Sequence, residues 1–99
     1  MSGNPNYPIS TAAVNWFDGG GQLHIRVYSS DGYTITERCN DGSGWVTGQF
    51  SAPGKTVSAM VWTASDGAPI RVYATIDDNT TEWACDPTTG WTKGSYTPT

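Results

Sequence analysis

The side chains of this chain that could bind a polar ligand occur in two matched sets. One set is Arg26, Glu37 and Trp45, and the other is Arg71, Glu82 and Trp91. An arginine donates parallel hydrogen bonds to adjacent oxygens, and a glutamate accepts hydrogen bonds from hydroxyls. An indole adds an apolar face and one N–H donor. A molecule with vicinal hydroxyls on one edge and C–H groups on one face, such as a sugar, would fit such a set.

A purely structural role for the same residues has to be weighed against binding. A cross-strand Arg–Glu pair stabilises a sheet by about 0.2–1 kcal/mol without any ligand. Trp16 and Trp62, which precede the two sets, have the character of core or packing residues. Each set also contains a Gly-Trp-x-x-Gly motif, at residues 44–48 and 90–94. Glycine beside an aromatic residue lets a ligand approach the backbone closely, so these motifs favour a binding site.

Catalysis has less support than binding. Most glycosidases use two carboxylates about 5–9.5 Å apart, but each set repeats one carboxylate, beside an arginine that would lower its pKa. The only histidine, His24, lies in a strand-like segment, where we expect a structural or solvated role. Two cysteines and one histidine give no metal-ligand spacing. We therefore expect no enzyme, no metal and no cofactor, and a disulfide between Cys39 and Cys85 stays an open alternative.

Whole segments recur together with these residues, which indicates the fold. The segment Ile-Arg-Val-Tyr at 25–28 returns at 70–73, after about 45 residues. A period in the mid-forties with strand-like alternation is typical of a β-propeller blade. We expect an all-β chain with two four-stranded blades. The predicted strands are residues 12–16, 23–29, 33–40 and 45–50, then 56–62, 69–75, 79–85 and 91–96.

The turn between the second and third strands of each repeat decides which side chains face each other. In the first repeat, Asp-Gly at 31–32 predicts a two-residue type I′ turn, which would place Arg26 directly opposite Glu37. In the second repeat, the turn formers at 77–79 predict a longer loop of about four residues. That loop would preserve the same Arg–Glu pairing.

The chain is long enough for one domain, and we expect that domain to consist of two blades. Its 99 residues cannot build two independent cores. We expect an extended lead-in at residues 1–10, a first blade at 11–54 and a second blade at 55–99. Closed propellers typically have four to eight blades, so two blades have to assemble with other copies. A trimer would give six blades, and a dimer or tetramer would give four or eight.

Charge and hydropathy exclude several classes of partner. The formal net charge is −4, whereas nucleic acids and anionic membranes attract basic patches. No apolar run approaches the roughly 18 residues of a membrane-spanning helix. The N-terminus shows no basic stretch followed by an apolar one, so we expect no secretory signal in these residues. The expected location is cytoplasmic or, after secretion by a non-classical route, extracellular.

The repeated motifs resemble those of a known lectin family. In Ile-Arg-Val-Tyr, Thr-Glu and Gly-Trp-x-x-Gly the chain resembles the fucose-binding β-propeller lectins of the Aleuria aurantia type, and especially the small two-repeat bacterial members of the Ralstonia type. The resemblance covers nearly all of residues 11–97. It implies a six-bladed propeller completed by trimerisation. It also implies a multivalent, metal-independent and non-catalytic lectin for L-fucose or fucosylated glycans on cell surfaces.

The resemblance further implies two kinds of sugar site, each between neighbouring blades. An intra-chain site would use Arg26, Glu37 and Trp91, and an inter-chain site would use Arg71, Glu82 and the Trp45 of a neighbouring chain. Ile25 and Ile70, just before the arginines, are candidates for an apolar pocket around the fucose methyl group.

The chain departs from the family pattern at one position of each repeat. Close bacterial relatives place an aromatic residue, which stacks on the sugar, three positions after the glutamate. Here those positions hold Asn40 and Cys85. Loss of one stacked aromatic removes about 1 kcal/mol of binding, so the glycan specificity stays open. Two other functions also stay open: a glycan-active propeller enzyme subunit, and a structural assembly module without sugar binding.

Overall fold

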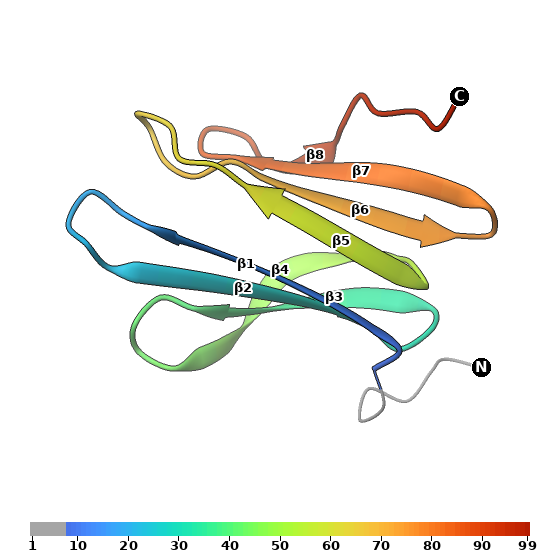
Figure 1. The fold of residues 1–99 in the computed structure, drawn as a ribbon, viewed down its shortest axis with the longest axis horizontal. Coiled ribbons are helices and arrows are strands. Elements are labelled where there is room, and N and C mark those ends of the chain that lie inside the picture. Colours follow the sequence, from blue (N-terminus) through green and yellow to red (C-terminus); the bar gives the residue numbers. More distant parts are fainter. Residues whose placement is uncertain (1–7) are drawn as a thin grey trace.

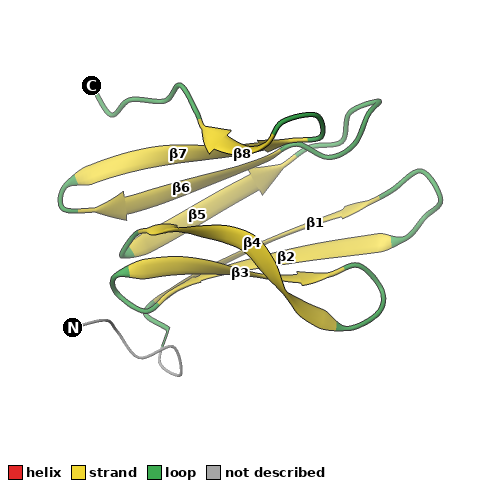
Figure 2. Cartoon of the chain, turned by 180° about the vertical axis from the view of Figure 1, so that it is seen from behind, coloured by secondary structure: helices red, strands yellow, loops and turns green. Residues whose placement is uncertain are grey.

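The computed structural model of the chain describes residues 8–99, whose regular structure is β-strand throughout (Figure 1, Figure 2). Two four-stranded antiparallel sheets follow one another, each with its strands in sequence order. The first sheet contains β1 (Ser10–Phe17), β2 (Leu23–Ser30), β3 (Thr34–Asn40) and β4 (Trp45–Pro53). The second sheet contains β5 (Thr56–Val61), β6 (Ile70–Ile76), β7 (Asn79–Asp86) and β8 (Gly90–Lys93). The predicted all-β class and two four-stranded units are confirmed.

The predicted strands agree with the observed ones to within about three residues at each end. The predicted lead-in at 1–10 lies outside the described residues as far as residue 7, and β1 already begins at Ser10. The largest differences are β4, which ends at Pro53 instead of residue 50, and β8, which ends at Lys93 instead of residue 96. Beyond β8, the backbone N–H of Tyr96 donates to the Glu82 carboxylate at 3.1 Å, so the chain follows this side chain rather than the ladder.

The two sheets share one apolar core. We call the face that each sheet turns toward the other its inner face, and the opposite one its outer face. The core contains Val14, Tyr28, Ile35, Phe50 and Ala52 of the first sheet and Ile70, Val72 and Ala74 of the second. The spacing of two residues places such side chains on one face of a strand. Trp91 of β8 extends the core, with its ring centre 4.5 Å from that of Phe50.

The first strands of the two sheets, β1 and β5, lie side by side (Figure 1). The backbone N–H of Val57 donates to the hydroxyl of Ser10 at 3.0 Å. Close to the link between the sheets, the Ser30 hydroxyl donates to the carbonyl of Gly54 at 2.8 Å. These bonds help to fix one sheet relative to the other and therefore the space that remains between their inner faces.

The pairing of β2 with β3 differs from the prediction. Tyr28 lies opposite Glu37, and Arg26 lies opposite Cys39, so the predicted Arg26–Glu37 pair is wrong by two residues. The cause is the hairpin, because the last pair of the β2–β3 ladder is Ser30 with Ile35, which leaves residues 31–34 between the paired positions instead of 31–32. The Asp31 carboxylate accepts hydrogen bonds from the backbone N–H of the third and fourth loop residues, at 3.0 Å each, and closes the longer loop.

The β6–β7 hairpin differs in the opposite sense. A two-residue loop joins these strands where the sequence predicted a longer one. Asp77 and Asp78 have φ values of 54° and 62°, as a type I′ turn requires. Tyr73 therefore lies opposite Glu82 and not Arg71. A shift of two residues keeps each arginine on the face of its glutamate, in diagonal positions.

Candidate ligand-binding site

A cavity of about 330 Å³ opens between the inner faces of the two sheets. The first sheet contributes Trp16, Arg26, Glu37 and Cys39, with Asp41 from the β3–β4 loop. The second sheet contributes Ile70, Cys85 and Trp91. The cavity thus brings a cation, two carboxylates and an apolar wall together from both halves of the chain.

Arg26 is held for binding by a partner that the sequence analysis missed. Its Nη1 donates to Asp41 Oδ1 at 2.8 Å and to the Ile25 carbonyl at 3.0 Å. The hydrogen bonds from Arg26 and then His24 hold the pKa of the Asp41 carboxyl below its ordinary value. Asp86 pairs with Arg71 in the same way, at 2.9 Å. Both aspartates follow the repeated glutamate by four positions, a signal that the repeat contained.

The two tryptophans expected as core or packing residues each lie under an arginine. Trp16 also packs against the core, whereas Trp62 is exposed. The guanidinium carbon of Arg26 is 5.0 Å from the ring centre of Trp16, and that of Arg71 is 4.9 Å from the ring centre of Trp62. A cation over an indole face gains about 0.5–2 kcal/mol, depending on how far it is desolvated. Each arginine is therefore fixed from two sides, by a carboxylate and by an indole.

Glu37 is buried and receives donors of its own. The Tyr28 hydroxyl donates to Glu37 Oε2 at 2.7 Å, and the Phe50 backbone N–H donates to Oε1 at 3.3 Å. Burial, followed by this hydrogen bond, raises the pKa of Tyr28 well above its ordinary value, so the phenol keeps its proton. Tyr28 thus holds the glutamate in place.

Gly48 explains the second glycine of the Gly-Trp-x-x-Gly motif. A Cβ atom at this position would overlap the Glu37 carboxylate, and a Cβ at Gly94 would overlap Glu82 in the same way. The second glycine therefore makes room for the glutamate rather than for a ligand, contrary to the first interpretation of the motif. In the second repeat, the hydrogen bond from Tyr73 is the main cause that lowers the pKa of Glu82.

The residues predicted for the intra-chain site meet in this cavity. Arg26 and Glu37 face Trp91 across it, and both Ile70 and Cys85 line the wall of the second sheet. The cysteines are free thiols, and burial raises the pKa of Cys39 to about 11. No structural disulfide joins the two cysteines, which both line the cavity.

The residues predicted for the inter-chain site are not brought together within one chain. Trp45 is 47% exposed and, with Val27 and Arg38, lines a shallow depression outside the cavity. Ile25 and Asn40 are also absent from the cavity lining. Arg71 and Glu82 lie in the paired strands β6 and β7 of the second sheet and do not line the cavity.

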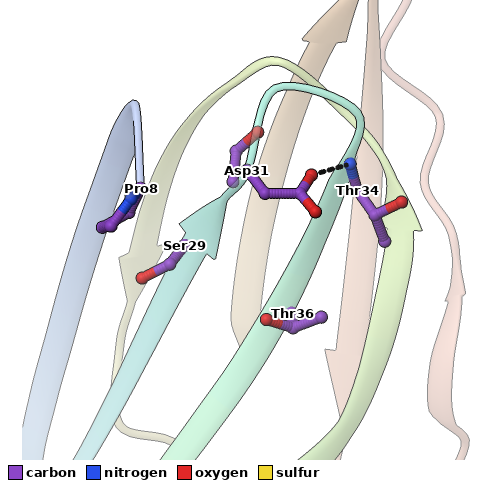
Figure 3. A pocket seen from close by; sticks show the side chains of 6 residues that line it. Pro8, Ser29, Asp31, Thr34 and Thr36 are labelled. Atoms are coloured by element: carbon purple, nitrogen blue, oxygen red, sulfur yellow. Dashed lines mark hydrogen bonds between the residues drawn. The ribbon is translucent and has the colours of Figure 1, made fainter. Parts of the chain in front are cut away.

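A second pocket, in the first sheet near the β2–β3 hairpin, has neither an arginine nor an aromatic residue in its lining. It encloses about 70 Å³ and is lined by Pro8, Ser29, Ser30, Asp31, Thr34 and Thr36. Figure 3 shows the Asp31 carboxylate bonded to the backbone of Thr34, and the Ser30 hydroxyl already donates to Gly54. These polar groups hold the hairpin.

Two further features of residues 8–99 bear on the chemistry. No group of three or more His, Cys, Asp or Glu side chains among them could hold a metal ion. Nor do these residues contain a helix long and apolar enough to cross a membrane.

Comparison with known proteins gives consistent matches. Residues 3–96 match the family model described as fungal fucose-specific lectin. The fucose-specific lectin of Aspergillus fumigatus is 34% identical in an alignment of 83 positions, and the match covers 73% of this chain and 25% of that protein. The chain thus spans about a quarter of the length of this relative. A fucose lectin from Kordia zhangzhouensis, solved in complex with methyl-fucoside, has 37% identity and a TM-score of 0.74, covering 91% of this chain and 67% of that one.

Proposed function

Because this chain belongs to the fungal fucose-specific lectin family, we propose that it binds L-fucose or fucosylated glycans in the cavity between its two sheets, without a metal and without catalysis. The observation that carries the proposal is the meeting of Arg26 and Glu37 with Trp91 from the opposite sheet. Charged donors and acceptors then face an apolar wall, as a sugar with hydroxyls and a methyl group requires.

The site keeps hydrogen-bonding capacity for a ligand. Arg26 has five N–H donors. Among residues 8–99, only its Nη1 and Nη2 have acceptors, and the bond from Nη2 to Asp41 is 3.4 Å long. Each oxygen of Glu37 receives one hydrogen bond in the chain and can accept another. Since both side chains are fixed before the ligand arrives, binding loses little side-chain entropy.

The same hydrogen bonds disfavour glycoside hydrolysis. The two carboxylates of the cavity, Glu37 and Asp41, are each engaged by donors of the protein. Asp41, whose pKa is lowered by Arg26, would not be protonated near neutral pH and could not serve as a general acid. Binding without turnover is therefore the function that this geometry supports.

We further propose that the second site forms between chains. Within one chain, the first sheet, which carries Glu37, packs against Trp91. In the same way, the second sheet, which carries Glu82, would pack against Trp45 of the next chain. Ile25 and Asn40 would then take the places that Ile70 and Cys85 have in the cavity. Trp45 and Tyr96, 47% and 45% exposed, would be covered. This head-to-tail contact is heterologous and has to close into a ring, and three chains would give a six-bladed propeller.

Calorimetric titration with methyl fucoside tests the binding proposal. Wild-type protein is expected to bind the sugar and to leave it intact. The Arg26→Ala/Arg71→Ala double variant is expected to lose the heat of binding. Lys55→Ala is the control, because it removes an exposed positive charge outside the cavity. No heat from wild type at millimolar sugar, or release of free fucose from a fucosylated glycan, would contradict the proposal.

A further inference from the structure

The single histidine joins two carboxylates beside the cavity. His24 Nδ1 lies 2.6 Å from Asp41 Oδ1, and Nε2 lies 2.8 Å from Asp18 Oδ2. The imidazole also stacks on Trp16, at 5.1 Å between ring centres and 14° between planes. The sequence suggested a structural or a solvated role for His24. Its side chain is 18% exposed and contacts both aspartates, so it is not a freely solvated histidine.

This geometry requires the protonated ring. A neutral imidazole has one N–H, so one of its nitrogens would turn a lone pair toward a carboxylate oxygen. An imidazolium donates to both aspartates and satisfies both contacts. In agreement with this, the hydrogen bonds to Asp18 and then Asp41 raise the pKa of His24 above its ordinary value.

The histidine is connected to the site through Asp41. Oδ1 of Asp41 accepts from both His24 Nδ1 and Arg26 Nη1. Asp18 is anchored independently, because its Oδ1 accepts from the backbone N–H groups of the β1–β2 loop at 2.9 and 3.0 Å. Within residues 8–99, the Asp41 carboxylate is held only by His24 and Arg26. When the ring loses its proton, we therefore expect the Asp41 carboxylate to move rather than Asp18, and Arg26, which is bonded to Asp41, to move with it.

The charges around the ring are few. Asp18 comes from the β1–β2 loop, Asp41 from the β3–β4 loop and Arg26 from β2. A pocket lies between the β5–β6 loop and the residues Trp16 and Asp18. The charged residue of that loop, Asp66, is not among the residues that line the pocket. Deprotonation of His24 would therefore leave two carboxylates with one cation, Arg26.

The second repeat lacks this device. Where the first repeat has Asp18 and His24, the second has Ala64 and Pro69. Ala64 follows from the offset of 46 residues between Trp16 and Trp62, and Pro69 from the offset of 45 between the arginines. Arg71 keeps Asp86 as its partner, without any imidazole. The chain therefore contains one arginine centre linked to a histidine and one that is not.

We propose that His24 is a positioning residue of the cavity between the sheets: its protonated ring fixes Asp41 and through it Arg26, so that this site binds its sugar more tightly at low pH, whereas the Arg71 centre does not respond. The inference rests on the proposed function of the site. The affinity for the sugar is highest while His24 carries its proton. It falls as pH rises through the pKa of His24 in the sugar-free protein, which lies above about 6.5.

The test uses Arg71→Ala, which leaves only the cavity between the sheets competent. Its affinity for methyl fucoside is expected to fall about 3- to 10-fold between about pH 5.5 and about pH 9. His24→Phe in the same background keeps the stack on Trp16 but cannot titrate. It is expected to bind weakly at every pH, with a flat profile. Arg26→Ala, which leaves only the Arg71 centre, is the matched flat control.

A second measurement needs no substitution. Because His24 is the only histidine, NMR of its ring gives its pKa directly in the free and the sugar-saturated wild type. Linkage requires saturation to raise that pKa by the logarithm of the affinity ratio between low and high pH. A pKa that sugar leaves unchanged, or a flat affinity profile in Arg71→Ala, overturns the inference and leaves the proposed function intact. Absence of binding at every pH overturns both.

Discussion

At the scale of single residues, the site depends on side chains that hold other side chains. Arg26 is fixed by Asp41 and Trp16, and Glu37 is fixed by the Tyr28 hydroxyl. The sequence predicted the arginine and the glutamate, because both types recur and both suit a sugar. The sequence did not identify the residues that fix these two side chains. The position of a residue in a strand indicates the face on which its side chain lies but not the group that it contacts.

Gly48→Ala tests the space reserved for the buried glutamate. The added Cβ would overlap the Glu37 carboxylate, so we expect a loss of about 1–3 kcal/mol in the free energy of unfolding and weaker sugar binding. Urea unfolding and calorimetry measure the two effects. Gly19→Ala is the control, since nothing lies within 4 Å of its Cβ. Equal behaviour of the two variants would contradict this role of Gly48.

Cys85→Trp tests the departure from the family pattern. Cys85 lines the cavity at the position where close bacterial relatives have a stacking aromatic residue. A new aromatic face there is expected to add about 0.5–1.5 kcal/mol, or roughly 2- to 10-fold, to sugar affinity. The comparison is made in the Arg71→Ala background, with Asn40→Trp as the control outside this cavity. An affinity of Cys85→Trp at or below that of its parent would show that the thiol wall already suits the ligand.

At the scale of the strands and turns, alternation predicted the elements but not their register. Hydrophobic alternation defines the strands, whereas register depends on the hairpin. Asp31 uses its carboxylate to close a four-residue loop, although Asp-Gly favours a tighter turn. Asp77 and Asp78 adopt positive φ without a glycine. Because both errors amount to two residues, the arginine and glutamate were still predicted on the correct face.

Gly32→Ala tests the longer hairpin loop. Gly32 has a φ of 103°, a conformation that an L side chain rarely adopts. We expect a loss of about 1 kcal/mol or more in the free energy of unfolding, with sugar affinity unchanged because the loop is remote from the cavity lining. Chemical unfolding and calorimetry check both parts. A variant as stable as wild type would show that the loop relaxes to another turn.

At the scale of the whole molecule, the residues of the proposed inter-chain site lie on different sheets of the chain. The second sheet carries Arg71 and Glu82, and the first carries the exposed Trp45. In the assembly proposed above, the contact between the two sheets of the chain is repeated between neighbouring chains. The period of the repeat in the sequence predicted such an assembly, because two blades alone do not close a propeller.

Trp45→Ala tests the assembly. Sedimentation of the wild type at micromolar concentration is expected to give a trimer, and the variant is expected to shift toward smaller species because the largest exposed side chain of the contact is lost. Lys55→Ala is the control for an exposed site without such a role. A wild-type protein that sediments as a stable monomer would contradict the closed ring.

The central claim is that a sugar binds between the two sheets, and a crystal structure of the protein saturated with methyl fucoside tests it most directly. The predicted result places the sugar between Arg26 and Trp91, with its hydroxyls hydrogen-bonded to Arg26 and Glu37 and its apolar side against Ile70 or Trp91. A sugar bound elsewhere on the chain, with this cavity empty at saturation, would contradict the claim.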